Sequence, residues 1–167
     1  KKRDINTTIN FYKRGLELTG LAHQKGVKIL AGTDTYDPYS FPGFTIHSEL
    51  EELVKAGLSP AEAIITATVN PAEYFSLLKD YGSIEEGKVA DILLLEKNPL
   101  NNIKNSTSIQ SVFYNGSLYS RKELDAMLTY VEENVSGISG LSLTVKVFFK
   151  LMKDNKPSAR NSVEEEK

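Results

Sequence analysis

Val27-Lys28-Ile29-Leu30-Ala31-Gly32 is a short, mostly apolar run without a two-residue alternation, and Thr33-Asp34 follow it directly. Such a run is typical of a strand buried on both faces, the kind found in parallel sheets. Asp34 then lies at the carboxyl end of a strand, where α/β folds bind their ligands. A carboxylate at that place ligates a metal or accepts a proton from a bound water. Taken alone, the Gly32-Thr33-Asp34 ending is equally compatible with a carboxylate that caps a turn or a helix.

Helices are predicted on both sides of this run. Apolar residues at near-helical spacing predict a helix over about residues 7–25, and a glycine follows as its stop. Residues 35–44 contain two prolines and a glycine, which predicts a loop. A second amphipathic helix is predicted over residues 46–57. The capping box Ser59-Pro60-Ala61-Glu62 predicts a third helix, and Asn70-Pro71-Ala72-Glu73 repeats that chemistry for a fourth.

The periodicity changes after Gly82. An apolar strand is predicted over residues 89–95, and two further strands flank Asn115-Gly116, a strong hairpin signal. The capping box Ser120-Arg121-Lys122-Glu123 predicts a helix that follows the hairpin. Residues 141–152 fit either a strand or a helix, and the polar residues 153–167 are expected to be disordered.

The composition narrows the class of protein. The chain has 167 residues, 40% hydrophobic and 25% charged, with a net charge of −2, so we expect no nucleic-acid or anionic-membrane partner. It has no cysteine, which excludes disulfides and thiolate metal sites. No apolar run approaches about 18 residues, so no transmembrane helix is predicted. The start lacks a signal-peptide core and a methionine. We therefore expect the true N-terminus to be missing, and the compartment, cytoplasmic or periplasmic, stays open.

Several motifs in a fixed order resemble the amidohydrolase superfamily, in its imidazolonepropionase-like and prolidase-like branch. The resemblance covers roughly residues 20–130. It rests on these stretches: Ile29-Leu30-Ala31-Gly32-Thr33-Asp34, Ile46-His47-Ser48-Glu49-Leu50, Ala56-Gly57-Leu58-Ser59-Pro60-Ala61-Glu62-Ala63, Ala67-Thr68-Val69-Asn70-Pro71-Ala72, Gly82-Ser83-Ile84-Glu85-Glu86-Gly87-Lys88-Val89-Ala90-Asp91-Ile92, Asn98-Pro99-Leu100, and Val112 with Asn115-Gly116.

The resemblance implies an α/β fold: the last strand and helices of a (β/α)8 TIM barrel, plus part of a composite β-sandwich. On this basis residues 1–80 belong to the barrel and 81–120 to the sandwich, while 121–152 are a helical extension and 153–167 a tail. The family's one or two divalent metals, zinc being expected, activate a water that attacks an amide-like or amidine-like carbon. In this family one aspartate is both a metal ligand and the proton shuttle, and the resemblance assigns that role to Asp34.

Other site residues are weaker candidates. His47 lies in a matched motif, where it is either a substrate contact or a helix-start histidine bonded to a backbone carbonyl. Tyr36, Asp37 and Tyr39 follow Asp34 in the loop, where substrate-selecting residues occur, although surface loop positions explain them equally well. His23, near the end of a helix, is expected to serve packing or the helix dipole.

The departure from the family pattern is large. The family's other metal ligands include a His-x-His pair, and neither of the chain's two histidines forms one before Asp34. A full barrel needs about 250 residues. We therefore expect that this fragment alone binds no catalytic metal tightly, hydrolyses nothing and associates into a homo-oligomer. The parent enzyme would act on a small amide, a cyclic amide or a dipeptide. The alternative is a non-catalytic α/β interaction or structural module derived from the same fold.

Overall fold

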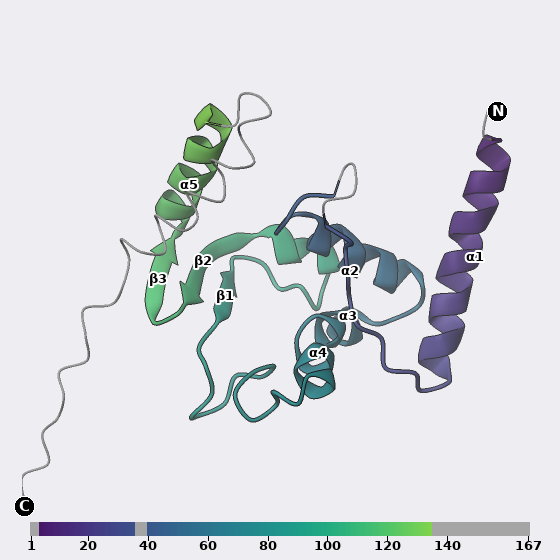
Figure 1. Ribbon diagram of the computed structural model, residues 1–167, viewed down its shortest axis with the longest axis horizontal. Helices are drawn as coiled ribbons and strands as arrows, with labels where there is room; N and C mark the ends of the chain where they lie inside the picture. Colours follow the sequence, from purple (N-terminus) through teal and green to yellow (C-terminus); the bar gives the residue numbers. More distant parts are fainter. Residues whose placement is uncertain (1–3, 36–39, 135–167) are drawn as a thin grey trace, which may run out of the picture. The chain divides into compact units, whose positions relative to one another are not determined.

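The computed structural model describes residues 4–35 and 40–134. The chain divides into two compact units. The first contains the described residues up to Val89 together with Leu95–Ser108, and the second contains Ala90–Leu94 and the residues from Ile109 on. The elements in chain order are α1 (Ile5–Gln24), α2 (Thr45–Lys55), α3 (Pro60–Thr66), α4 (Val69–Tyr74), β1 (Ile92–Leu95), η1 (Ile103–Thr107), β2 (Ile109–Tyr114), β3 (Ser117–Ser120) and α5 (Arg121–Asn134) (Figure 1).

Helix α1 confirms the predicted first helix and is tied to α2. It begins after Asp4, whose side chain accepts a hydrogen bond from the Asn6 amide, and it ends before Gly26, which has a φ of 80°. Gly20 on α1 is buried against the backbone carbonyl of Ala56 at the end of α2. A glycine is required there because any Cβ would collide with that oxygen.

The core of the first unit lies between α2, α3 and η1. Its buried residues are Leu50, Leu53, Leu58, Ala63 and Ile103. The predicted capping box is confirmed, since the Ser59 hydroxyl accepts from the Glu62 amide at 3.3 Å and the Glu62 carboxylate accepts from the Ser59 amide at 2.7 Å. This pair of bonds satisfies two amides that the start of α3 would otherwise leave without partners.

Replacing Ser59 with alanine should destabilise the chain by about 1 kcal/mol, because α3 loses its N-cap and α3 supplies core residues. Urea unfolding followed by circular dichroism measures the change. Ser48→Ala is the control: Ser48 is exposed on α2 and makes no side-chain hydrogen bond among the described residues, so its effect should stay within about 0.5 kcal/mol. Equal effects of the two substitutions would contradict the assigned cap.

Residues 27–32 differ from the prediction of a strand buried on both faces. They are not part of a sheet, and only alternate residues, Ile29 and Ala31, pack against the core. The other side is open, since Leu30 is 38% exposed, and Val27 at the start of the segment is 54% exposed as well. A strand buried on both faces needs neighbours on both edges. Among the described residues outside α1, residues 27–32 make one backbone hydrogen bond, in which the Ala31 amide donates to the Thr66 carbonyl at 3.0 Å.

Helix α4 begins differently from the prediction. Asn70 was expected to cap it, but α4 starts at Val69 after Thr68, which makes no side-chain cap bond. The Asn70 side chain instead donates to the backbone carbonyl of Ile29 at 2.7 Å. The Asn70 side chain thus donates to a distant carbonyl on the extended segment and does not accept from a local amide at the start of α4.

The second unit contains a three-stranded sheet in the order β1-β2-β3. The predicted hairpin is confirmed: β2 pairs with β3 antiparallel, with Tyr114 opposite Ser117. Asn115 and Gly116 both have positive φ, 49° and 76°, as a type I′ turn requires. Strand β1 is shorter than the predicted strand over residues 89–95.

Helix α5 follows the hairpin as predicted and contacts both β2 and β3. Its capping box is present, because the Glu123 carboxylate accepts from the Ser120 amide at 2.7 Å and the Ser120 hydroxyl accepts from the Glu123 amide at 3.4 Å. The expectations for residues 141–152 and for the tail 153–167 lie outside the described residues. No helix in the described part of the chain is long and apolar enough to cross a membrane.

Candidate active site

Asp34 ends the extended segment with its side chain exposed and its backbone in the left-handed region, at a φ of 46°. Two other residues besides glycine share a positive φ among the described residues, and local structure explains both. Asn115 lies in the hairpin turn, and Ser76 follows the end of α4. Asp34 lies in neither setting. Such conformations gather at functional sites, where the surroundings hold them in place.

Hydroxyl groups hold the backbone around Asp34. The Ser40 hydroxyl donates to the Thr33 carbonyl at 2.9 Å, and the Thr33 and Thr35 hydroxyls lie 2.6 Å apart in a hydrogen bond. The start of the next helix is fixed similarly, since the Phe41 amide donates to the Thr45 hydroxyl at 2.7 Å. Tyr36, Asp37 and Tyr39 lie outside the described residues, so the structure does not place these candidates.

His47 lies in the first turn of α2 and is half-buried. Its Nδ1 forms a hydrogen bond with the Ser106 hydroxyl, 2.9 Å away, so the partner is a side chain and not the backbone carbonyl weighed from the sequence. Burial lowers the pKa of His47 below its ordinary value. The neutral form of the ring therefore predominates at pH 7.

Sequence reasoning missed Ser106. The residue is buried, with 7% of its surface exposed, and lies on η1, 59 positions after His47. The one available signal was its spacing of three from the apolar Ile103, which places both on one face of a 3₁₀ turn. Nothing in that spacing points to His47.

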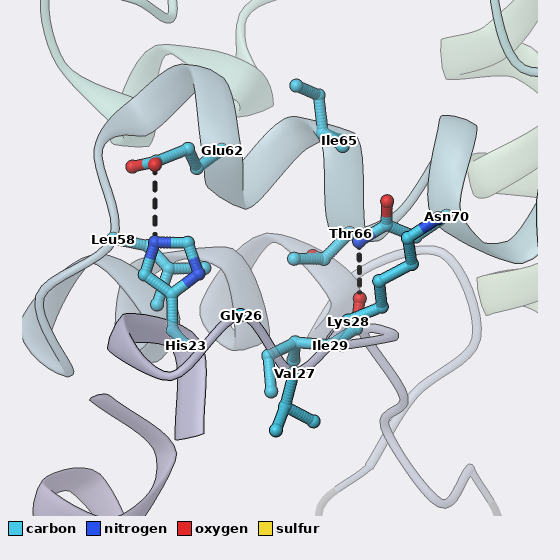
Figure 2. A pocket seen from close by; sticks show the side chains of 10 residues that line it. All are labelled: His23, Gly26, Val27, Lys28, Ile29, Leu58, Glu62, Ile65, Thr66 and Asn70. Carbon is cyan, nitrogen blue, oxygen red and sulfur yellow. Dashed lines mark hydrogen bonds and ion pairs between the residues drawn. The ribbon is translucent and has the colours of Figure 1, made fainter. Parts of the chain in front are cut away.

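A small pocket lies at the other end of the extended segment (Figure 2). Residues 26–29 line it together with His23 and residues of α3 and α4. Figure 2 shows the His23 ring facing the Glu62 carboxylate. The Nε2 and Oε1 atoms lie 3.2 Å apart, a side-chain contact that differs from the packing or helix-dipole role expected for His23. The volume of about 230 Å³ is below the roughly 300–1,000 Å³ of typical ligand sites. The pocket lies at the start of the segment, away from Asp34, and this position favours a structural role for it.

The described residues do not by themselves fit a tightly held metal. Zinc sites use three or four protein ligands. Within residues 4–35 and 40–134, no three or more His, Asp or Glu side chains gather closely enough to hold a metal ion. Asp34 therefore offers one ligand, and a complete site needs others.

Curated proteins with similar sequences are enzymes whose names denote different reactions. Adenine deaminase 2 of Jannaschia sp. is 42% identical over 65 residues, which are 39% of this chain and 10% of that protein. Imidazolonepropionase of Symbiobacterium thermophilum is 34% identical over 71 residues, 42% of this chain and 16% of that protein. Ochratoxinase of Aspergillus niger is 40% identical over 85 residues, 50% of this chain and 17% of that protein. The chain thus matches less than a fifth of the length of each relative.

Solved structures that resemble this chain are also hydrolases, and the chain again covers only part of each. A Xaa-Pro dipeptidase with bound methionine in its active site superposes with a TM-score of 0.58 and 31% identity, over 63% of this chain and 25% of that one. Phenylurea hydrolase B superposes with a TM-score of 0.57 and 30% identity, over 65% of this chain and 27% of that one. The mixed helix and sheet content predicted from the sequence is confirmed.

The sequence model of the amidohydrolase family matches residues 13–119, well over half of the chain. This range contains Asp34, His47 and Ser106. It also contains every motif on which the predicted resemblance rests, so that resemblance is confirmed. The chain belongs to the amidohydrolase family.

Proposed function

We propose that this chain supplies Asp34 to a metal-dependent hydrolase of carbon–nitrogen bonds in small amides, cyclic amides or dipeptides. The family match and the relatives named imidazolonepropionase and Xaa-Pro dipeptidase support this class of reaction. The observation that carries the proposal is Asp34 itself. It is an exposed carboxylate in a left-handed conformation, at the end of an extended segment inside the matched range.

Asp34 has two roles in this proposal, metal ligand and proton shuttle. Asp34 would be one ligand of a divalent metal, which members of the family generally bind and which we propose to be zinc; when bound, such a metal would supply an activated water. The Asp34 carboxylate would accept a proton from the attacking water and pass it to the leaving nitrogen. The hydroxyl bonds around Thr33 hold the backbone on either side of Asp34, from which its carboxylate projects. His47, Tyr36 and Tyr39 are the proposed substrate contacts.

The proposal requires further strands beside residues 27–32. Val27 and Leu30 expose apolar side chains, and among the described residues the amides of Lys28 and Leu30 have no hydrogen-bond partner. Both features suit a barrel strand with neighbours on each edge, as in a (β/α)8 barrel, with residues 81–120 in a composite sandwich. Other ligands for the metal would come from those strands.

The test compares two polypeptides with and without added zinc. One is this chain, and the other is the longest polypeptide translated from its reading frame. We expect hydrolysis of a panel of amides, cyclic amides and dipeptides by the longer polypeptide, sensitive to a chelator, and none by residues 1–167. Zinc content after dialysis should be below stoichiometric for residues 1–167. Chelator-insensitive turnover, or none by either polypeptide, would contradict the proposal.

One observation favours a second candidate, a non-catalytic interaction or structural module. The described residues hold no group of three metal-ligating side chains. If the reading frame encodes no more than this chain and no other polypeptide restores hydrolysis, the module is the better description.

We also propose that residues 1–167 self-associate through the extended segment. Its open edge and exposed Leu30 are features that promote pairing with another copy. Leu30→Lys should weaken self-association by about tenfold in dissociation constant, because it places a charge in the contact. Analytical ultracentrifugation measures this, with Leu18→Lys, at an exposed position of α1, as the control. A compact monomer at all concentrations would rule out the proposed pairing.

A further inference from the structure

Helix α2 and the short helix η1 meet along one seam. On α2, His47 and Leu50 are three residues apart and share a face. On η1, Ile103 and Ser106 are also three residues apart, which is one turn of a 3₁₀ helix. Leu50 and Ile103 are buried in the same core cluster, and the His47–Ser106 hydrogen bond lies one turn along the same seam.

Hydrogen bonds within η1 and to residues 96–98 hold η1 in place. The Asn102 side chain caps it by accepting from the Lys104 amide at 3.1 Å, and the Asn105 side chain donates to the Asn98 carbonyl at 2.8 Å. The carbonyl and the side chain of Ser108 accept from the amides of Glu96 and Lys97. The backbone that carries Ser106 is therefore fixed, and its hydroxyl faces His47 from a rigid element.

The hydroxyl proton of Ser106 has one acceptor among the described residues, the Nδ1 of His47. The neighbouring hydroxyls behave differently: Thr107 donates to the Lys104 carbonyl at 2.9 Å and Ser108 to the Asn105 carbonyl at 2.6 Å. If Nδ1 carried a proton and donated to Ser106, the buried hydroxyl would have no acceptor in this part of the chain. Buried donors rarely lack an acceptor, so the hydroxyl donates and Nδ1 accepts.

We propose that Ser106 is a positioning residue that fixes His47 in the tautomer protonated at Nε2, so that His47 enters the active site as a hydrogen-bond donor. A neutral imidazole carries one N–H, so a Nδ1 that accepts leaves the proton on Nε2. No described residue bonds to Nε2. A donor at that atom suits an oxygen of the substrate, either the carbonyl of the scissile amide or a carboxylate. Assigning His47 to the substrate rests on the proposed function, whereas the tautomer does not.

Nitrogen-15 NMR of the two imidazole rings in residues 1–167 tests the tautomer. The chain has only His23 and His47, so His23→Gln assigns both rings, and the measurement requires neither metal nor turnover. Above the pKa of His47 we expect Nε2 to be the protonated nitrogen and Nδ1 the acceptor. The preference should be about tenfold or more, the factor that one hydrogen bond provides.

Two substitutions at Ser106 separate positioning from packing. Ser106→Ala should reduce the preference of His47 for the Nε2–H form, and Ser106→Thr, which keeps the hydroxyl, should restore it; His23 should keep its signals in both. A wild-type His47 protonated at Nδ1 would overturn the proposal, and so would an Ala variant with an unchanged tautomer. The wild-type measurement decides even if a variant fails to fold. Failure of the hydrolysis assay with the expected tautomer would count against the proposed function alone.

Discussion

Asp34→Asn is expected to lower kcat/KM of the longer polypeptide by about 10³-fold or more, because a neutral amide neither accepts the proton nor matches a carboxylate as a metal ligand. Asparagine is the informative replacement here. It tolerates a φ of 46° as well as aspartate does, so the backbone around Thr33 should stay in place. The loss then reports the carboxylate itself.

Steady-state kinetics, with metal analysis of the same preparations, measures this effect. The control is Asp80→Asn, an exposed carboxylate within the family-matched range that is not assigned to the site. Asp80→Asn should retain activity within about twofold, since surface substitutions rarely perturb the fold. Circular dichroism should be unchanged for both variants. Near-normal turnover by a folded Asp34→Asn protein would remove Asp34 from the mechanism.

Local signals predicted much of the fold. The capping boxes at Ser59 and Ser120 and the turn at Asn115-Gly116 all appear where the sequence placed them. Each involves groups within three residues of one another, so a short window of sequence contains both partners. Asp34 ends an extended segment, but the buried sheet strand that the same local reasoning predicted before it is absent from the described residues.

Features that depend on distant partners were not predictable. Asn70 satisfies the sequence pattern of a helix cap, yet its side-chain amide donates a hydrogen bond to the carbonyl of Ile29, 41 residues away. The hydrogen bond between His47 and Ser106 links residues 59 apart and has no signature in either segment. The strand expected over residues 27–32 requires neighbours that a local pattern cannot supply. Tertiary competition for hydrogen bonds explains the first two differences, and the third arises because residues 27–32 have no neighbouring strand among the described residues.

Gly20→Ala is expected to destabilise the chain by about 2–3 kcal/mol, although alanine normally favours a helix over glycine. A Cβ at Gly20 would lie 2.1 Å from the carbonyl oxygen of Ala56, so α1 and α2 must separate or their backbones must shift. The cost should appear first as weaker docking of α1. Tyr12 on α1 reports that docking, because its hydrogen bond to Glu52 raises the pKa of Tyr12.

Gly15→Ala is the matched control on the same helix. Apart from its chain neighbours and the backbone of α1 itself, no atom lies within 4 Å of a Cβ placed at Gly15. Alanine there should therefore stabilise the chain by about 0.5–1 kcal/mol through helix propensity alone. Urea unfolding of both variants gives the two free energies, and NMR titration of Tyr12 shows whether α1 remains docked. If the two substitutions change the free energy of unfolding in opposite directions, the effect of the contact with Ala56 is separated from that of helix propensity. If Gly20→Ala instead stabilised the chain as Gly15→Ala does, the close packing of α1 on α2 would be wrong.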